Sequence, residues 1–269
     1  MLTSTFLHLP SAGPMFERSM WNQGINDWWN FLDQKKIHGV SCRRKIWYDM
    51  AIRKAADALD AGNATFFSTL LPPSSMWRLW PSFQDQAVFL DIETTGYYGD
   101  VTVVGLFGED GVQTFVRGRN MDKEALLNAL SHYKIILTFN GSSFDLPVLS
   151  RYFNITFTQP HIDLRGVCNH LDLRGGLKKI EQTIGLKRPD AVEGMDGYHA
   201  VLLWEEFRKT GDEKFLEQLV EYNTQDIVNL KPLAEYAIPR IWKLVRSAHL
   251  QDYPRSPQYW RGKKIHHKG

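Results

Sequence analysis

The chain is poor in cysteine, in charge of one sign and in long apolar runs. Its 269 residues include only two cysteines, which excludes a disulfide framework and a cysteine-based zinc site. The net charge of +2 permits a polyanionic partner without indicating one. No segment reaches the roughly 20 apolar residues of a membrane span, and the start lacks the pattern of a signal peptide. We therefore expect a cytoplasmic protein without membrane or dinucleotide-cofactor sites.

What the chain does contain is ample material for a core, with 43% hydrophobic and 13% aromatic residues. The segment Leu71-Pro-Pro-Ser-Ser75 cannot continue a helix, and we place a domain boundary there. The prediction is a small helical domain at 1–72, a linker at 73–84, an α/β domain at 85–246 and a basic tail at 247–269. Further basic clusters at 35–36 and 43–45 are as readily explained by a solvated surface.

The α/β domain begins with three short strands. Residues 87–92 form an almost wholly apolar run, which is typical of a central strand buried on both faces. Residues 101–107 and 112–116 are β-branched runs joined by a hairpin turn. A helix at 121–133, a strand at 134–139, a helix capped by Ser142 or Ser143, and a strand at 161–164 follow. Helices at 177–184, 198–209 and 212 to about 236 complete the order. It predicts a ribonuclease H-like mixed sheet, with a three-strand antiparallel meander plus two parallel strands, flanked by helices.

Two acidic residues close the first strand. Because side chains alternate along a strand, Asp91 and Glu93 project from one face, at an end of the sheet where ligands bind in α/β proteins. Neighbouring carboxylates repel each other, and a bound cation removes that cost. An isolated Asp-x-Glu pair would more often be a solvated strand end, so the pair alone does not establish a metal site.

Two further acids and a tyrosine follow. Asp145 falls in the first turn of a helix, where the helix dipole alone would favour an anion. Tyr222 and Asp226 lie four residues apart on a helix and share a face. The tyrosine is a poor general base because its ordinary pKa is about 10, so orienting a water is its more plausible role. Taken singly, a buried tyrosine beside a surface aspartate is the better explanation of this pair.

The order Asp91-x-Glu93, Asn140-x-x-x-Phe-Asp145 and Tyr222-x-x-x-Asp226 resembles the tyrosine-bearing (DEDDy) branch of the DEDD 3′–5′ exonucleases, and most closely its YprB-like group. The resemblance runs from about residue 88 to residue 230. It implies hydrolysis of DNA or RNA from a 3′ end, on a single strand or another nucleic acid with that end. The products would be nucleoside 5′-monophosphates.

The same resemblance implies a role for each site residue. Asp91, Glu93 and Asp226 would hold a catalytic Mg²⁺ or Mn²⁺, Asp91 would bridge to a second ion, and Asp145 would help through a water ligand. Thr94, Thr95 and Asn140 would contact the terminal nucleotide. All of these assignments, of metal ligands and of nucleotide contacts alike, are expectations.

Several alternatives stay open. The opening segment around Pro10-Ser-Ala-Gly13 resembles a helix-hairpin-helix that has lost a glycine, so it is as readily a packing module as a phosphate site. Asp163 is interpreted as structural. Trp28, Trp29, Trp77 and Trp80 could stack on bases, although burial is the more common fate. A non-catalytic nucleic-acid-binding or scaffold protein and a structure-selective endonuclease are the competing functions.

Overall fold

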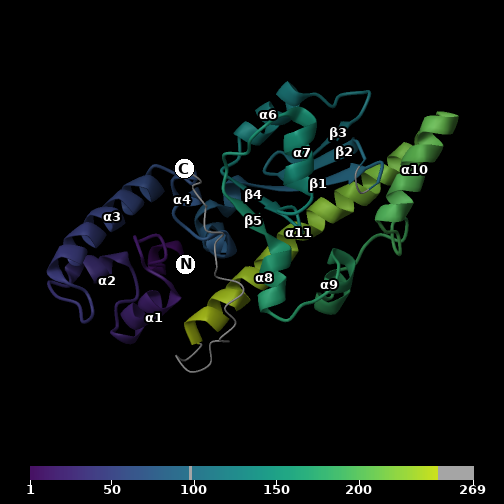
Figure 1. The fold of residues 1–269 in the computed structure, drawn as a ribbon. Coiled ribbons are helices and arrows are strands. Elements are labelled where there is room, and N and C mark those ends of the chain that lie inside the picture. The colour runs from purple at the N-terminus through teal and green to yellow at the C-terminus, as the bar shows by residue number, and fades with distance from the viewer. Residues whose placement is uncertain (97–98, 248–269) are drawn as a thin grey trace, which may run out of the picture.

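A computed structural model describes residues 1–96 and 99–247, and a five-stranded sheet in the order β3-β2-β1-β4-β5 forms its centre (Figure 1). Strands β1 (Ala87–Thr94), β2 (Val101–Gly108) and β3 (Gly111–Val116) pair antiparallel in sequence. On its other edge β1 is parallel to β4 (Ile135–Thr138), which is parallel to β5 (His161–Asp163). The predicted mixed sheet, a meander plus two parallel strands, is therefore confirmed.

Helices cover both faces of this sheet, and β1 is buried between them. On one face α6 (Lys123–Ser131) and α7 (Asp145–Phe153) pack against a cluster that includes Val88, Leu90 and Ile92. On the other face lie α8 (Leu164–His170) and the long α11 (Glu213–Ser247), against the side of β1 that carries Phe89. Because side chains alternate, Asp91 and Glu93 share the face of Phe89 and point toward α11.

The remaining elements differ from the sequence prediction mainly in extent. They are η1 (Leu2–Ser4), α1 (Pro14–Asn22), α2 (Trp28–Asp33), α3 (Cys42–Asp60), α4 (Thr65–Ser68), η2 (Pro73–Leu79), α5 (Trp80–Phe83), η3 (Gln84–Gln86), α9 (Leu177–Ile184) and α10 (Gly197–Thr210). Helix α8 was not predicted. Helix α11 continues beyond the predicted end near Tyr236 and through Pro239, because its buried side chains Ala237, Ile238 and Ile241 keep it packed.

The N-terminal helices and the α/β part share one apolar cluster, which runs from Leu2 to Ile241. Residues 73–84, predicted as a linker, are helical and largely buried. Arg78 donates to both oxygens of Glu17 at 2.8 and 2.9 Å, and these side chains are 5% and 2% exposed. At the domain boundary predicted near residue 72, the chain therefore runs through a continuous hydrophobic core. The domain limits themselves remain a prediction.

Three of the four tryptophans considered for base stacking are core residues. Trp28, Trp77 and Trp80 are buried, whereas Trp29 is 50% exposed. In the segment that resembles a helix-hairpin-helix, Ser11 adopts a positive φ of 60°, a conformation that favours glycine. Of the predicted basic tail, all but Ser247 lies outside the described residues. Within residues 1–96 and 99–247, no helix combines the length and the apolar character needed to cross a membrane.

Candidate metal and active site

Three of the predicted acids meet between β1 and α11. Asp91, Glu93 and Asp226 each place one carboxylate oxygen within 4.8 Å of the other two. Glu93 and Asp226 are buried, and Asp91 is partly exposed. Residues 91 and 226 lie 135 positions apart in the chain, and they meet because α11 crosses the sheet face from which Asp91 and Glu93 project. Oxygen ligands at this separation fit a divalent cation such as Mg²⁺ or Mn²⁺.

A glycine on β2 lets α11 approach so closely. Gly105 pairs with Asp91, and a Cβ atom at this position would lie 2.0 Å from Oδ1 of Asn223. Asn223, on α11, donates from Nδ2 to Oδ2 of Asp91 at 2.9 Å. Among the described residues, its buried Oδ1 has no hydrogen-bond partner. Gly105 and Asn223 therefore set the distance between α11 and the strand that carries two of the acids.

Asp145 contacts β1 from the side on which β1 pairs with β4. Its Oδ1 accepts a hydrogen bond of 3.1 Å from the backbone N–H of Ile92. That N–H is available because the pairing of β1 with β4 extends only from Ala87 to Phe89. Phe144 is the N-cap of α7 and its side chain makes no capping hydrogen bond, so the predicted serine cap is wrong. Asp145 is thus fixed by the sheet, beside the three-acid group but outside it.

The electrostatics of these acids favour a cation. Burial, followed by the charges of the neighbouring acids, raises the pKa of both Asp91 and Glu93 well above the ordinary range. Burial also raises the pKa of Asp145, to about 7. Charged carboxylates are therefore costly here unless a positive charge lies among them. An all-oxygen, mutually repelling donor set is what a site for hard divalent cations requires, so the residues fit the predicted metal.

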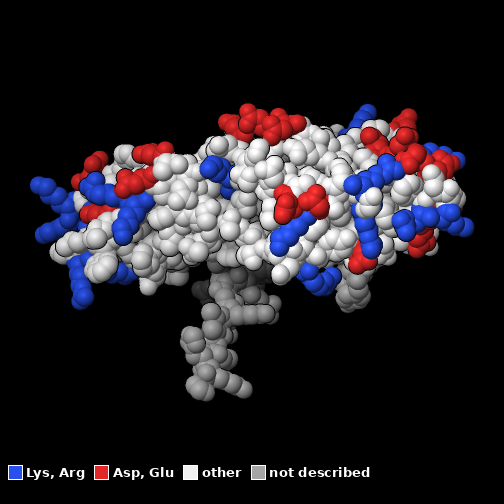
Figure 2. All heavy atoms as spheres, turned by 90° about the horizontal axis from the view of Figure 1, so that it is seen from above, with Lys and Arg blue, Asp and Glu red and all other residues white. Residues whose placement is uncertain are grey.

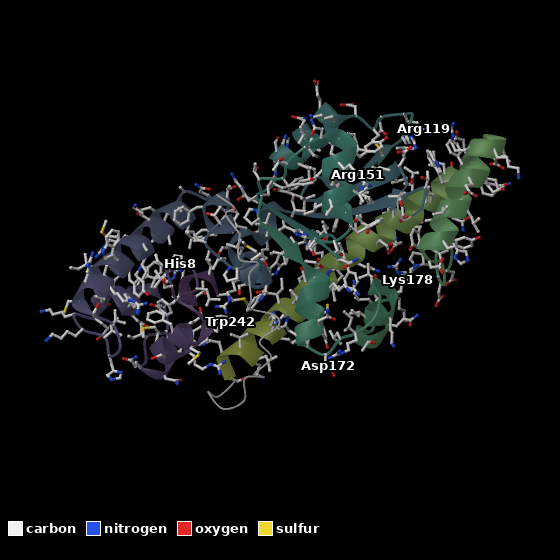
Figure 3. The ribbon with its side chains drawn as sticks, in the orientation of Figure 1. His8, Arg119, Arg151, Asp172, Lys178 and Trp242 are labelled. Atoms are coloured by element: carbon white, nitrogen blue, oxygen red, sulfur yellow. The ribbon has the colours of Figure 1, made fainter. Side chains whose placement is uncertain are left out.

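Tyr222 lies one turn before Asp226 on α11 and is 4% exposed. Lys178 of α9 points toward α11 (Figure 3), and its Nζ donates to the Tyr222 hydroxyl at 2.9 Å. Burial raises the pKa of Tyr222, and the charge of Asp226 raises it further, so the phenol keeps its proton. The hydroxyl accepts from Lys178, which leaves its own proton to be donated to another group.

Arg188 was not foreseen from the sequence, yet it contacts Asp226 directly. Its Nη2 donates to Oδ1 of Asp226, while Nε and Nη2 donate to the two oxygens of Glu181 at 2.6 and 2.8 Å. The side chains of Arg188 and Glu181 are 6% and 2% exposed. No motif marks this pair, because a cation in the loop after a helix is usually a surface residue.

The residues predicted to contact a terminal nucleotide make local hydrogen bonds. Thr94 donates from Oγ1 to the carbonyl of Gly96 at 2.7 Å. Thr95 is exposed, and its Oγ1 accepts from the backbone N–H of Asp100 at 3.0 Å. The side chain of Asn140 accepts from Arg165 at 2.6 Å. Their contact with a substrate remains a prediction.

Asp163 has the structural role that was predicted for it. Its side chain caps α8 by accepting from the backbone N–H of Arg165. It also accepts from the backbone N–H groups of Asn140 and Ser142, at 2.8 and 3.2 Å. Asp163 thereby holds the turn between β4 and α7, which carries Asp145.

Comparison with known proteins places the fold in a family. The family model described as the RNase H superfamily matches residues 88–238, more than half of the chain. This protein belongs to the RNase H superfamily. No curated protein matches it. Among solved structures, the family B DNA polymerase of the archaeon Pyrobaculum calidifontis is similar, with 16% identity and a TM-score of 0.48 over 60% of this chain. The match spans 25% of the polymerase chain, and so distant a likeness has no bearing on activity.

All five predicted catalytic residues lie within the segment that matches the RNase H superfamily. Outside the acidic site, the distribution of basic side chains bears on the predicted basic clusters. On the face seen in Figure 2, Lys and Arg side chains lie at both ends of the molecule, with Asp and Glu side chains among them. In the predicted basic cluster at 43–45, Lys45 is buried and paired with Asp49 at 2.7 Å. This cluster is therefore less basic than its sequence suggests.

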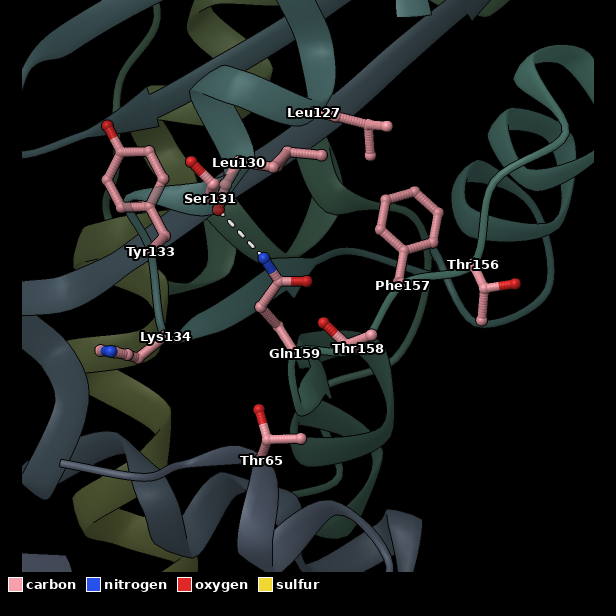
Figure 4. Close-up of a pocket in the computed structure, with 10 residues that line it drawn as sticks. All are labelled: Thr65, Leu127, Leu130, Ser131, Tyr133, Lys134, Thr156, Phe157, Thr158 and Gln159. Atoms are coloured by element: carbon pink, nitrogen blue, oxygen red, sulfur yellow. Dashed lines mark hydrogen bonds between the residues drawn. The ribbon is translucent and has the colours of Figure 1, made fainter. Parts of the chain in front are cut away.

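A hollow of about 450 Å³ lies between α4, the end of α6 and residues 156–159 (Figure 4). Gln159, which lines it, donates to the carbonyl of Leu130 at 3.0 Å. Lys134, another lining residue, immediately precedes β4, and its backbone N–H bonds to Gln86 just before β1. The hollow thus lies near the N-terminal ends of the parallel strands β1 and β4. Asp91 and Glu93 lie toward the opposite, C-terminal end of β1.

Proposed function

We propose that this protein is a metal-dependent 3′–5′ exonuclease that hydrolyses phosphodiester bonds of DNA or RNA and releases nucleoside 5′-monophosphates. The proposal is carried by one observation: acids from β1 and α11, remote in sequence, converge within 4.8 Å in a chain of the RNase H superfamily. The superfamily supports a nuclease. The tyrosine one turn before Asp226 supports the DEDDy type.

The four acids would have different roles in metal binding. Asp91, Glu93 and Asp226 would hold Mg²⁺ or Mn²⁺, with Asp91 also facing a second ion and Asp145 acting through a water. Bound ions would supply the Lewis acidity that activates water and stabilises the leaving 3′ oxygen. The hydrogen bonds from Asn223 to Asp91, and from the Ile92 amide to Asp145, keep two of these carboxylates oriented.

Tyr222 would orient the attacking water. Because its pKa is raised, the phenol stays protonated at neutral pH and cannot act as a general base. Lys178 occupies an acceptor position of the hydroxyl, so the phenolic proton is directed elsewhere, and a water beside Asp226 would receive it. Loss of the hydroxyl should therefore slow hydrolysis without removing a metal ligand.

The test is digestion of matched DNA and RNA single strands, labelled at the 5′ end, in Mg²⁺ or Mn²⁺. Stepwise shortening from the 3′ end, abolished by EDTA and by Asp91→Asn or Asp226→Asn, is expected. Tyr222→Phe should slow the reaction. Glu235→Gln, an exposed acid on the same helix as Asp226, is the matched control and should behave as the wild type.

A circular single strand separates the alternatives. An exonuclease leaves it intact, whereas cleavage would indicate an endonuclease. Binding of linear strands without hydrolysis, and without any effect of metal, would indicate a non-catalytic binding protein. Wild-type activity in both aspartate variants would show that the site is assigned to the wrong residues.

A further inference from the structure

A buried cluster on the α9 side of the site has no role in the mechanism above. Its members form a chain of contacts from α9 to α11. Asn229 donates from Nδ2 to Oε1 of Glu181 at 3.1 Å, Glu181 binds Arg188 through two nitrogens, and Arg188 binds Asp226. Asp226 and Asn229 are three apart on α11, so both face α9. The chain of contacts ends on a proposed metal ligand.

The local sequence explains how Arg188 reaches its partner. Helix α9 ends at Gly185, which has a φ of 83°, a conformation available to glycine without strain. The backbone N–H of Leu186 then bonds back to the carbonyl of Glu181 at 2.9 Å. This turn reverses the chain and brings Arg188 alongside Glu181. The guanidinium cannot lose its proton, so it remains a cation under all ordinary conditions.

We propose that the Glu181–Arg188 pair is a positioning device, which fixes Asp226 so that its second oxygen is presented to a divalent cation. Arg188 binds Oδ1 of Asp226, and no described hydrogen bond uses Oδ2. The inference rests on the proposed function, because it takes Asp226 as a metal ligand. It assigns roles to two residues that no sequence motif identifies.

Arg188 has two opposing effects on metal binding. It orients Asp226, which favours binding, and its positive charge repels a divalent cation, which disfavours it. Glu181 decides between the two effects. Its carboxylate lies 2.6 and 2.8 Å from the Arg188 nitrogens in a nearly water-free environment, so the pair has no net charge. The orientation of Asp226 therefore outweighs the repulsion. Hydrogen-bonding partners of metal ligands typically contribute about 10–100-fold to metal affinity, which sets the expected size of the effect.

The experiment is calorimetric titration of the 269-residue chain with Mn²⁺, without nucleic acid. Arg188→Gln should weaken Mn²⁺ binding about 10–100-fold, because Asp226 loses its fixed orientation. Arg188→Lys keeps the charge but lacks the planar fork that spans two carboxylates, so a smaller loss is expected. Glu181→Gln should also weaken binding. The double variant should be no weaker than the single ones if the pair acts as one unit.

The chain offers a matched control in Arg78, which forms an equally buried pair with Glu17 among the N-terminal helices. Arg78→Lys disturbs a guanidinium–carboxylate pair of the same kind and should leave Mn²⁺ affinity within about twofold. Unchanged or tighter binding in Arg188→Gln would overturn the proposal, as would wild-type affinity in Arg188→Lys. If the Arg188 variants do not fold, Asn229→Ala decides in the same way, with weaker binding expected and wild-type binding refuting the idea.

The outcome is distinguishable from a failure of the proposed function. A wild-type protein that binds Mn²⁺ but degrades no strand would refute the nuclease and leave the positioning pair in place. A wild-type protein that binds no Mn²⁺ would refute the positioning pair, whatever the digestion assays give.

Discussion

Replacing Asp145 with asparagine should stabilise the metal-free protein. Asp145 is 2% exposed, and burial raises its pKa from 3.8 to about 7. Since the folded state favours the protonated acid, the charged form costs stability above pH 7, and this cost disappears as the pH falls toward 3.8. At about 1.36 kcal/mol for each pKa unit, the cost at pH 8 is about 4 kcal/mol. Asp145→Asn has no such charge and can still accept the hydrogen bond from the Ile92 amide.

The assay is urea unfolding of the wild type and Asp145→Asn in EDTA, at pH 8 and pH 4. The variant should be more stable by up to about 4 kcal/mol at pH 8 and by less than about 1 kcal/mol at pH 4. Saturating Mn²⁺ should narrow the gap at pH 8, because metal binding stabilises the folded wild type. Glu235→Gln is the exposed control. An Asp145→Asn protein that is no more stable than the wild type at pH 8 in EDTA would refute the electrostatic account of the site.

Three further predictions concern the surroundings of the acids and the N-terminal core. Gly105→Ala places a Cβ 2.0 Å from Asn223 Oδ1, so it should lower the free energy of unfolding by about 1–3 kcal/mol in urea titrations, and Asn223→Ala in the same chain should recover part of the loss. Asn223→Ala alone removes the 2.9 Å hydrogen bond to Asp91 and should weaken Mn²⁺ binding about tenfold in calorimetry; unchanged affinity would show that this bond is irrelevant to the metal. Burial lowers the pKa of His8 from 6.5 to about 4, so between pH 7.5 and pH 4.5 the wild type should lose about 2–3 kcal/mol of stability relative to His8→Phe, as the unfolded wild-type chain takes up a proton on His8. His8→Phe lacks this contribution, and an identical pH dependence in both proteins would contradict the burial of a neutral histidine.

The sheet and the acids could be predicted because local patterns specify them. The apolar run before Asp91 reads directly as a buried strand, and alternation fixes which side Asp91 and Glu93 share. The ends of the helices were harder to predict from the sequence. Serines near Asp145 suggested a cap, but Ser142 and Ser143 lie outside the helix and bind Asp163 and Asn140 instead. Tertiary partners, which the sequence does not reveal, decided the outcome.

Arg188 and Gly105 show where sequence reasoning stops. Gly105 lies inside a β-branched run and could have been noticed as a residue that leaves room on a strand. Its significance depends on which helix crosses it, and that is a property of the fold. Arg188 is one of 32 lysines and arginines, and only the turn at Gly185 brings it onto Glu181 and Asp226. Long-range pairing of this kind has no local signature.

The path of α11 gives the N-terminal helices a role in the site that does not require contact with nucleic acid. Tyr222, Asn223 and Asp226 all depend on where this helix lies. Its C-terminal half is held by the N-terminal part: Trp242 packs edge-on against Trp21 and Trp77, with ring centroids 5.8 and 6.2 Å apart. Arg246 adds a hydrogen bond of 2.8 Å to Asn26. Because α11 is continuous from Asp226 to Arg246 and its buried side chains pack along the core between them, anchoring the helix at residues 242–246 also helps to fix its path past β1.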